Sequence, residues 1–445
     1  MTSTTPAPRR PSSVRRVVTA SLVGTSLEWY DFFLYGSAAA LVFNKLFFPT
    51  FDPLTGTLLA FTTYAVGFVA RPIGGIVFGH YGDKLGRKNV LVVTLLLMGI
   101  ATVLIGLLPT YAQIGAGAPI LLVTLRFIQG LGLGGEWGGA VLMSLEHGKP
   151  EQRGLAASWP QVGVPMGNLL ATAVLGLMSL TLSEDAFLSW GWRLPFLLSG
   201  LLVLVGLWIR FTITESPLFA EVAESKKRAR MPIVDVVRIY PRELLVAIGA
   251  RIGTDIAFYT FVLFILAYIT TTLGLPRTTG LIAVMVGSAC QLVLIPLFGA
   301  LSDRVGRKPV YLAGAAGAGV WVFVFFAMLD TKSTALIILT TVVALVFHAM
   351  MYGPQAAFMT EMFSTRLRYS GASLTYQVSG ILGGGLAPLI SLKLLDVYDT
   401  PMAVAVYVAA ALGLTIVSLL LAPETRDIDL NAEREEEQRI LESTA

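Results

Sequence analysis

Long apolar runs, separated by short polar or charged segments, recur from one end of the 445-residue chain to the other. A helix of about 20 apolar residues is long enough to cross the ~30 Å hydrocarbon core of a bilayer. We predict twelve such helices, over residues 17–43, 57–82, 89–109, 118–145, 154–181, 192–213, 243–272, 279–302, 309–329, 333–362, 370–392 and 401–422. The pattern therefore predicts an all-α membrane protein with twelve transmembrane helices.

The segments outside these runs divide the chain. Residues 1–16 are basic and have too little apolar surface to fold, so we expect a disordered tail. Residues 17–213 form a first six-helix half, and 243–422 form a second. The charged stretch 214–242 is expected to be a cytoplasmic linker, and 423–445 an acidic cytoplasmic tail too short for a sustained coiled coil.

A repeated loop relates the two halves. The sequence GHYGDKLGRK at 79–88 returns as GALSDRVGRK at 299–308, which is a shift of 220 residues. A second set matches at a shift of 215 residues: Glu146, Arg153 and Ser158 correspond to Glu361, Arg368 and Ser373. Two fused, related halves explain both sets, so we expect them to be pseudo-symmetric.

Charge placement gives the orientation, because loops that cross the membrane avoid Lys and Arg. Basic clusters fall on alternate connections, at 9–16, 84–88, 149–153, 226–230, 304–308 and 366–368. Both termini are therefore predicted to be cytoplasmic. The chain is 55% hydrophobic and 13% charged, which excludes a soluble protein of this length. Its net charge of +4 follows from the basic loops, so the expected partner is the lipid bilayer and not nucleic acid.

Cofactor and metal chemistry find no support in the sequence. The single cysteine, Cys290, excludes an intramolecular disulfide framework and a cysteine-based metal site, and the three histidines lie far apart. Gly130, Gly132 and Gly135 spell G-x-G-x-x-G, but the run is intramembrane and no strand precedes it. We expect no cofactor and no metal.

Ionisable residues inside the apolar runs are the main functional candidates, because a charge in the hydrocarbon core costs at least ~2.5 kcal/mol. Glu28 and Asp31 share one face of the first helix near the bilayer centre. Further examples are Arg71, Arg126, Glu136, Arg251, Asp255 and His348. Except for Arg71, they fall on the first, fourth, seventh and tenth helices.

At this point a family resemblance can be stated. The two G-x-x-x-D-[KR]-x-G-R-K loops resemble a motif of the major facilitator superfamily. The motifs RFIQG at 126–130, EWYDF at 28–32, GEWGG at 135–139 and ESP at 215–217 are together similar to its metabolite:proton symporter family. The resemblance covers essentially the whole chain. It implies that helices 1, 4, 7 and 10 line a central cavity around which the halves rock. It also implies organic acids or zwitterions as substrates.

The repeated loops are predicted to act as a conformational latch, since a merely topogenic basic loop would not need a matched Asp and Gly. The residues concerned are Gly79, Asp83, Arg87, Lys88, Asp303, Arg304 and Arg307. For proton coupling we predict Glu28, Asp31, Glu136 and His348, because two acids on one face repel unless one is protonated or an arginine intervenes. His348 is alternatively a packed polar residue.

Substrate contacts are predicted for Tyr30, Tyr35, Arg71, Arg126, Gln129, Gln161, Arg251, Asp255 and Tyr259. Arg126 can hold a carboxylate with both edges of its guanidinium group or compensate the acids. Arg251 and Asp255 form either a structural pair or a substrate contact.

The sequence thus predicts a proton-coupled symporter that imports a small organic acid across a bacterial cytoplasmic membrane, working as a monomer. Import of a zwitterionic osmolyte such as proline or betaine is the alternative. An intramembrane enzyme is a third reading, but it needs a converging nucleophile, base and orienting group, which the sequence does not offer.

Overall fold

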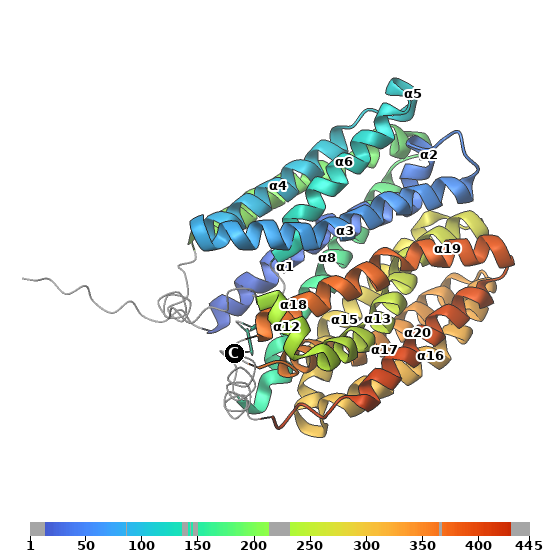
Figure 1. Ribbon diagram of the computed structural model, residues 1–445. Helices are drawn as coiled ribbons and strands as arrows, with labels where there is room; N and C mark the ends of the chain where they lie inside the picture. The colour runs from blue at the N-terminus through green and yellow to red at the C-terminus, as the bar shows by residue number, and fades with distance from the viewer. Residues whose placement is uncertain are drawn as a thin grey trace, which may run out of the picture.

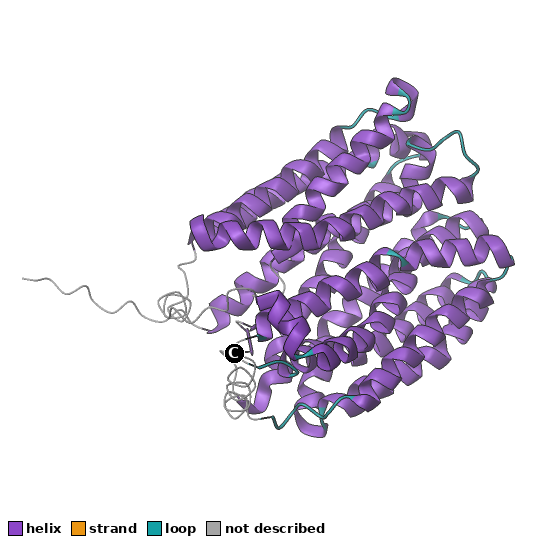
Figure 2. Ribbon diagram, viewed as in Figure 1, coloured by secondary structure: helices purple, strands orange, loops and turns teal. Residues whose placement is uncertain are grey.

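The computed structural model describes residues 14–85, 87–135, 141–142, 144–145, 150–212, 232–364 and 367–428. Regular structure in these ranges is helical throughout, without a strand, which confirms the all-α prediction (Figure 2). Eight of the described helices are long and apolar enough to cross a membrane. A ninth candidate is the bent pair Glu184–Gly191 and Arg193–Trp208, with 41° between its parts.

The first half of the chain contains α1 (Val14–Ala38), η1 (Ala39–Phe43), α2 (Asn44–Leu46), α3 (Pro53–Leu85), α4 (Arg87–Leu107), α5 (Tyr111–Ile114), α6 (Gly117–Gly132), η2 (Leu133–Gly135), η3 (Pro150–Gln152), α8 (Arg153–Thr181), α9 (Glu184–Ala186), η4 (Phe187–Gly191) and α10 (Arg193–Thr212). The start of α3 has a local cause. The Asp52 side chain accepts hydrogen bonds from the backbone of Leu54 and Thr55, at 3.1 and 3.0 Å, and the bonds to Thr55 lower the pKa of Asp52.

The second half contains α12 (Pro232–Ile239), α13 (Pro241–Tyr259), η5 (Thr260–Phe264), α14 (Ile265–Ala267), η6 (Tyr268–Thr272), α15 (Arg277–Val305), α16 (Arg307–Asp330), α17 (Thr334–Glu361), α18 (Arg368–Ser379), η7 (Gly380–Gly385), α19 (Ala387–Tyr398) and α20 (Pro401–Leu421). The short helix α12 lies within the predicted linker and buries Val236. The elements η1, η4, η5, η6 and η7 are π-helical turns.

Two bundles lie side by side, one from each half of the chain, and meet along two seams (Figure 1). In one seam α8 packs along α15 and touches α17, and in the other α3 packs against η7 and α19. We call the end where α1 begins and α20 ends the terminal end, and the other the opposite end.

The distribution of side chains is inverted relative to a soluble protein. Val320, Leu245 and Val293 on the outer surface are 70–71% exposed, whereas Arg126 and Glu361 are fully buried. Lipid hydrocarbon can surround the exposed apolar side chains, but it offers no hydrogen bonds to charged ones. The charged side chains are therefore enclosed by the helices.

Small residues let two helices of the first half touch backbone to backbone. A Cβ atom placed on Gly74 of α3 would lie 1.9 Å from the carbonyl oxygen of Leu131 in α6. A Cβ on Gly134 of η2 would lie 2.1 Å from the carbonyl oxygen of Arg71. Because a backbone atom cannot swing aside as a side chain can, even one methyl group must separate α3 from α6.

We expect Gly74→Ala to lower the thermal unfolding temperature of the detergent-solubilised protein, because overpacking costs about 1–3 kcal/mol. Gly413→Ala in α20 is the matched control. A Cβ at Gly413 meets no atom within 4 Å, so the better helix propensity of Ala should leave stability equal or higher. Equal unfolding temperatures for the two variants would contradict the close approach.

Candidate functional site

An aromatic layer fills the centre of the molecule, where the two bundles face each other. Phe32 and Phe33 come from α1, Tyr64 and Phe68 from α3, and Tyr259 from α13. The Phe68 ring centre lies 5.0 Å from that of Phe32 in the first half and 5.7 Å from that of Tyr259 in the second. Gly384 in η7 leaves room for these rings, since a Cβ there would lie 2.5 Å from the Tyr259 ring. The layer therefore joins the halves.

Two arginines from the first half face this layer. The guanidinium carbon of Arg126 lies 4.5, 4.3 and 4.8 Å from the ring centres of Phe32, Tyr35 and Tyr64. That of Arg71 lies 4.2 and 4.7 Å from the rings of Phe32 and Phe68. The ring faces attract these cations but accept few hydrogen bonds. Within the described residues, Nε and Nη2 of both arginines have no hydrogen-bond acceptor.

A chain of hydrogen bonds connects Arg126 to the buried acid of α1. Arg126 Nη1 donates to Gln129 Oε1 at 2.5 Å, and Gln129 Nε2 donates to Thr102 Oγ1 at 2.9 Å. Asp31 accepts from Thr102 at 3.1 Å and from Ser199 at 2.5 Å. The Thr102 hydroxyl is also 2.9 Å from the carbonyl oxygen of Met98, and its single proton serves one acceptor at a time. A change in the charge of Asp31 can therefore alter the hydrogen bonds of Thr102 and Gln129, and through these two neutral groups the environment of Arg126.

In the second half, the buried arginine is compensated by a direct ion pair. Arg251 Nε donates to Asp255 Oδ2 at 3.0 Å, and both side chains are at most 7% exposed. Arg251 also donates to Gln355 at 3.2 Å and lies 3.8 Å from the Tyr376 ring. Gln355 in turn donates to the Tyr311 hydroxyl at 2.5 Å. This pair is largely neutralised within the half, unlike Arg126.

His348 lies between two rings in the second half. Its ring centre is 4.4 Å from that of Phe258 and 5.1 Å from that of Tyr352. The amide Nε2 of Gln291 lies 2.8 Å from His348 Nδ1, and an amide nitrogen can only donate, so this geometry assigns the proton to Nε2 of a neutral imidazole. His348 is thus buried among aromatic rings, and its part in proton coupling stays a prediction.

The other predicted contact residues fall in different places. Tyr35 shares a hydrogen bond of 2.6 Å with Thr63, and Tyr259 belongs to the central layer. Tyr30 points away from the centre and donates to the carbonyl oxygen of Pro195 in α10 at 2.8 Å. Glu28 and Gln161 are buried, at 8% and 0% exposure. Glu136 lies outside the described residues.

Several central residues carried no signal in the sequence. Phe68, Tyr64 and Phe258 are aromatic residues within apolar runs that contain many others, and Tyr311 and Gln355 are single polar residues without a local partner. Only the packing of separate helices brings them together. Gln355 directly follows Gly353 and Pro354, two residues that disfavour a regular helix, and this was the one available hint.

At the terminal end, the second copy of the repeated loop reaches across the seam. The Asp303 carboxylate accepts from the backbone N–H groups of Gly154 and Leu155, at 2.8 and 2.9 Å. These are the first free N–H groups of α8, so the acid of the second half caps a helix of the first. Arg307 donates to Asp303 at 2.6 Å and to both oxygens of Glu361 at 3.3 Å, whereas Arg304 contributes its carbonyl oxygen to Arg426.

The first copy of the loop can be followed only in part. The chain places Gly79 and Asp83 in α3 and Arg87 and Lys88 in α4. Their side chains lie outside the part of the structure that is described.

The segment after α20 adds a cap that the sequence reading missed. Glu424 accepts from the backbone N–H groups of Arg307 and Lys308, at 2.8 and 3.0 Å, and so closes the start of α16. Thr425 donates to Glu361 at 2.7 Å, and Arg153 of the first half donates to the carbonyl oxygen of Ile428 at 3.2 Å. Within the predicted acidic tail at 423–445, Thr425 is fully buried, whereas Pro423 and Glu424 are exposed.

At the opposite end, one arginine of the second half is held by the first. Arg277, at the start of α15, donates to Ser179 at 2.8 Å and pairs with Glu184. Its guanidinium carbon lies 3.7 Å from the Phe187 ring centre. Lys45 also pairs with Glu184, at 3.0 Å. The described residues thus join the halves at both ends.

Two bundles of apolar helices, with charged groups enclosed at their common centre, define a multi-pass membrane transporter. Family comparisons make this specific: residues 17–235 match the model "Sugar (and other) transporter", and 244–444 match the model "Major Facilitator Superfamily". The chain belongs to the major facilitator superfamily, and is a transporter rather than an enzyme.

Curated relatives extend over nearly the whole chain. The inner membrane metabolite transport protein YhjE of Escherichia coli (strain K12) is 41% identical over 93% of this chain and 95% of its own. The shikimate transporter of the same organism is 42% identical over 93% and 96%. The proline/betaine transporter of the same organism is 33% identical, over 90% of this chain and 82% of its own length.

Solved structures agree on the fold. The partially occluded inward-open form of the xylose transporter XylE from E. coli superposes with a TM-score of 0.72, covering 94% of this chain and 99% of that one. At 18% identity, this likeness concerns the fold alone.

For the terminal-end contact, we expect Asp303→Asn to open the seam, because a neutral amide loses the charge interaction with the start of α8, about 1 kcal/mol. In a Cys290→Ala background, Ser158→Cys next to Gly299 reports the opening. Its alkylation rate should rise roughly fivefold, as about 1 kcal/mol implies.

Asp396→Asn is the control, since that acid pairs only with Lys393 on the surface of α19 and is 43% exposed. If Asp303→Asn alkylates no faster than this control, Asp303 does not hold the seam closed.

Proposed function

We propose that the protein is a proton-coupled symporter that imports a small organic acid by alternating access. The observation that carries the proposal is the pair Arg71 and Arg126. Both are buried at the centre, at 3% and 0% exposure, and each directs two N–H-bearing nitrogens to no acceptor in the described structure. Unsatisfied buried donors are expensive, and a carboxylate is the group that a guanidinium edge binds best. Relatives that include a shikimate transporter support this reading.

Twelve spans fit the helices observed. If α1 with η1, α4, α6 and α10 are counted as spans together with the eight long apolar helices, each half has six spans. We infer that both termini are cytoplasmic from the alternating basic loops. The bacterial relatives, one of them named as an inner membrane protein, support the cytoplasmic membrane as the location. A monomer suffices, because both arginines and both seams lie in one chain.

Alternating access is supported by the nature of the seams. Asp303 with α8 at the terminal end, and Arg277 with Glu184 at the opposite end, are polar contacts of a few groups each. Such contacts can be exchanged for water when one end opens. The aromatic layer between them would then close over a bound substrate.

Proton coupling is proposed for Asp31. Asp31 is linked to Arg126 by hydrogen bonds through Thr102 and Gln129, so protonation of Asp31 changes the electrostatic field at the guanidinium group without blocking it. A protonated acid leaves the arginine more attractive to a substrate carboxylate. Glu28, buried one turn earlier, is the second candidate.

A zwitterionic osmolyte is the competing substrate. The aromatic faces of Phe68, Tyr64 and Tyr259 could also hold a quaternary ammonium group, and Asp255 adds an acid nearby. The relatedness to a proline/betaine transporter favours keeping this alternative.

Counterflow in proteoliposomes separates the two. Vesicles preloaded with an unlabelled compound should accumulate the labelled form of the same compound when it is shikimate or another small organic acid. They should not do so when it is proline or betaine. Arg126→Lys keeps the charge but loses the planar fork, so exchange affinity should fall roughly tenfold, as about 1.5 kcal/mol for a charged hydrogen bond implies.

Arg193→Lys is the matched control, because Arg193 donates to the carbonyl oxygens of Gly106 in α4 and of Leu108 just after it. Counterflow of betaine but of no acid would overturn the organic-acid assignment.

For coupling, we expect Asp31→Asn to abolish uphill uptake driven by a pH gradient while substrate exchange continues. The amide fills the same space between Ser199 and Thr102 but cannot carry a proton across. Uptake and internal acidification are measured together in the same vesicles. If both Asp31→Asn and Glu28→Gln acidify the vesicles as the unaltered protein does, neither acid carries the proton.

A further inference from the structure

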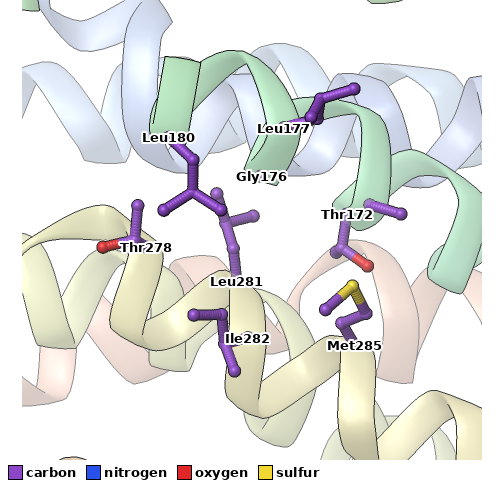
Figure 3. A pocket seen from close by; sticks show the side chains of 9 residues that line it. Thr172, Gly176, Leu177, Leu180, Thr278, Leu281, Ile282 and Met285 are labelled. Atoms are coloured by element: carbon purple, nitrogen blue, oxygen red, sulfur yellow. The ribbon is translucent and has the colours of Figure 1, made fainter. Parts of the chain in front are cut away.

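A notch of about 190 Å³ lies in the seam between α8 and α15, away from the central arginines. Thr172, Gly176, Leu177 and Leu180 line it from α8, and Leu281 and Met285 face them from α15 (Figure 3). Each bundle therefore supplies one wall.

The notch offers almost no polar chemistry. The Thr172 hydroxyl donates within its own helix, to the carbonyl oxygen of Asn168 at 2.7 Å. The other walls shown in Figure 3 are mostly carbon. A polar solute placed here would lose its hydration without gaining partners, which costs about 1–3 kcal/mol or more for each group. The volume is also below the 300 Å³ or so of small-molecule pockets.

The surroundings identify the occupant. Leu177 and Leu180, at the rim, are 55% and 67% exposed on a helix long and apolar enough to span the membrane. The solvent that reaches such a rim is lipid hydrocarbon. A flexible, slender apolar chain matches both the lining and the volume.

The notch sits between two polar contacts of the same seam. One turn toward the terminal end, Asn168 donates to Ser288 at 3.0 Å across the halves. At the other end of the notch, next to the lining residues Leu180 and Thr278, Arg277 donates to Ser179 at 2.8 Å. The apolar hollow is thus bounded along the seam, and whatever fills it touches both halves at once.

Gly176 creates the hollow. A Cβ placed there meets no atom within 4 Å, so a larger side chain can grow into the notch without a clash. Since Gly is the weakest ordinary helix former, its replacement does not threaten α8.

We propose that this notch binds one acyl chain of a membrane phospholipid, which wedges between α8 and α15 and contacts both halves. An acyl chain that fits only this arrangement of the seam stabilises it by mass action. The consequence for transport rate rests on the alternating-access function proposed above, whereas binding itself does not.

The test uses the full-length protein in proteoliposomes that contain a phospholipid with a photoreactive diazirine midway along one acyl chain. After illumination, labelled peptides are mapped by mass spectrometry. We expect labelling of 172–180 and 278–285 several-fold above that of the apolar stretch of α16 around Val320, although Val320, at 71%, is more exposed than Leu177 and Leu180.

Gly176→Leu should remove this excess, and Gly413→Leu, at the open site on α20, should keep it. Ala173→Leu fills the same notch from a neighbouring position and replaces Gly176→Leu if that variant does not fold. Labelling equal to that around Val320, or an excess that survives both filling variants, overturns the proposal. Because no substrate is present, the result is independent of whether the organic-acid function holds.

Discussion

The interior of the helix bundles offers few hydrogen-bond partners and little screening, and the buried arginines Arg307, Arg251 and Arg126 meet that constraint in different ways. Arg307 is enclosed by the carboxylates of Asp303 and Glu361. Arg251 pairs with Asp255 one helical turn away. Arg126 instead lies against aromatic faces, with its nearest acid two hydrogen-bonded groups distant. Arg307 and Arg251 are thus saturated, whereas Arg126 and Arg71 at the centre keep donors without an acceptor among the described residues.

This difference separates the two halves of the chain, which share the repeated loop. The first half carries two open cations, Arg126 and Arg71, and a buried acid connected to Arg126 by hydrogen bonds, and the second carries a self-neutralised pair. The second copy of the loop joins the halves, since its Asp303 caps α8 of the first half. The halves therefore interlock at the terminal end and differ in charge compensation at the centre.

Patterns that stay within one helix were readable from the sequence, and contacts between helices were not. The apolar runs predicted the spans, and the four-residue spacing of Arg251 and Asp255 indicated their pair because one turn brings such residues together. A helix buried on all sides gives no signal of which face is central, and the Tyr30 hydroxyl donates to Pro195 in α10. Its contact with substrate stays a prediction. Glu424 caps α16 from 117 residues away, beyond any local pattern.

The π-helical turns carry a consequence for the geometry of the spans. A π-turn takes up one extra residue, and a residue corresponds to about 100° of rotation in an α-helix. The side chains after η5 and η7 are thus turned relative to those before, although the helix axis continues. Tyr259 precedes η5 and Tyr268 follows it, so the directions of their side chains are not related by regular α-helical spacing. If one such π-turn became regular α-helix, the part of the span beyond the turn would rotate about the helix axis relative to the part before it. The direction of the span across the membrane would not need to change.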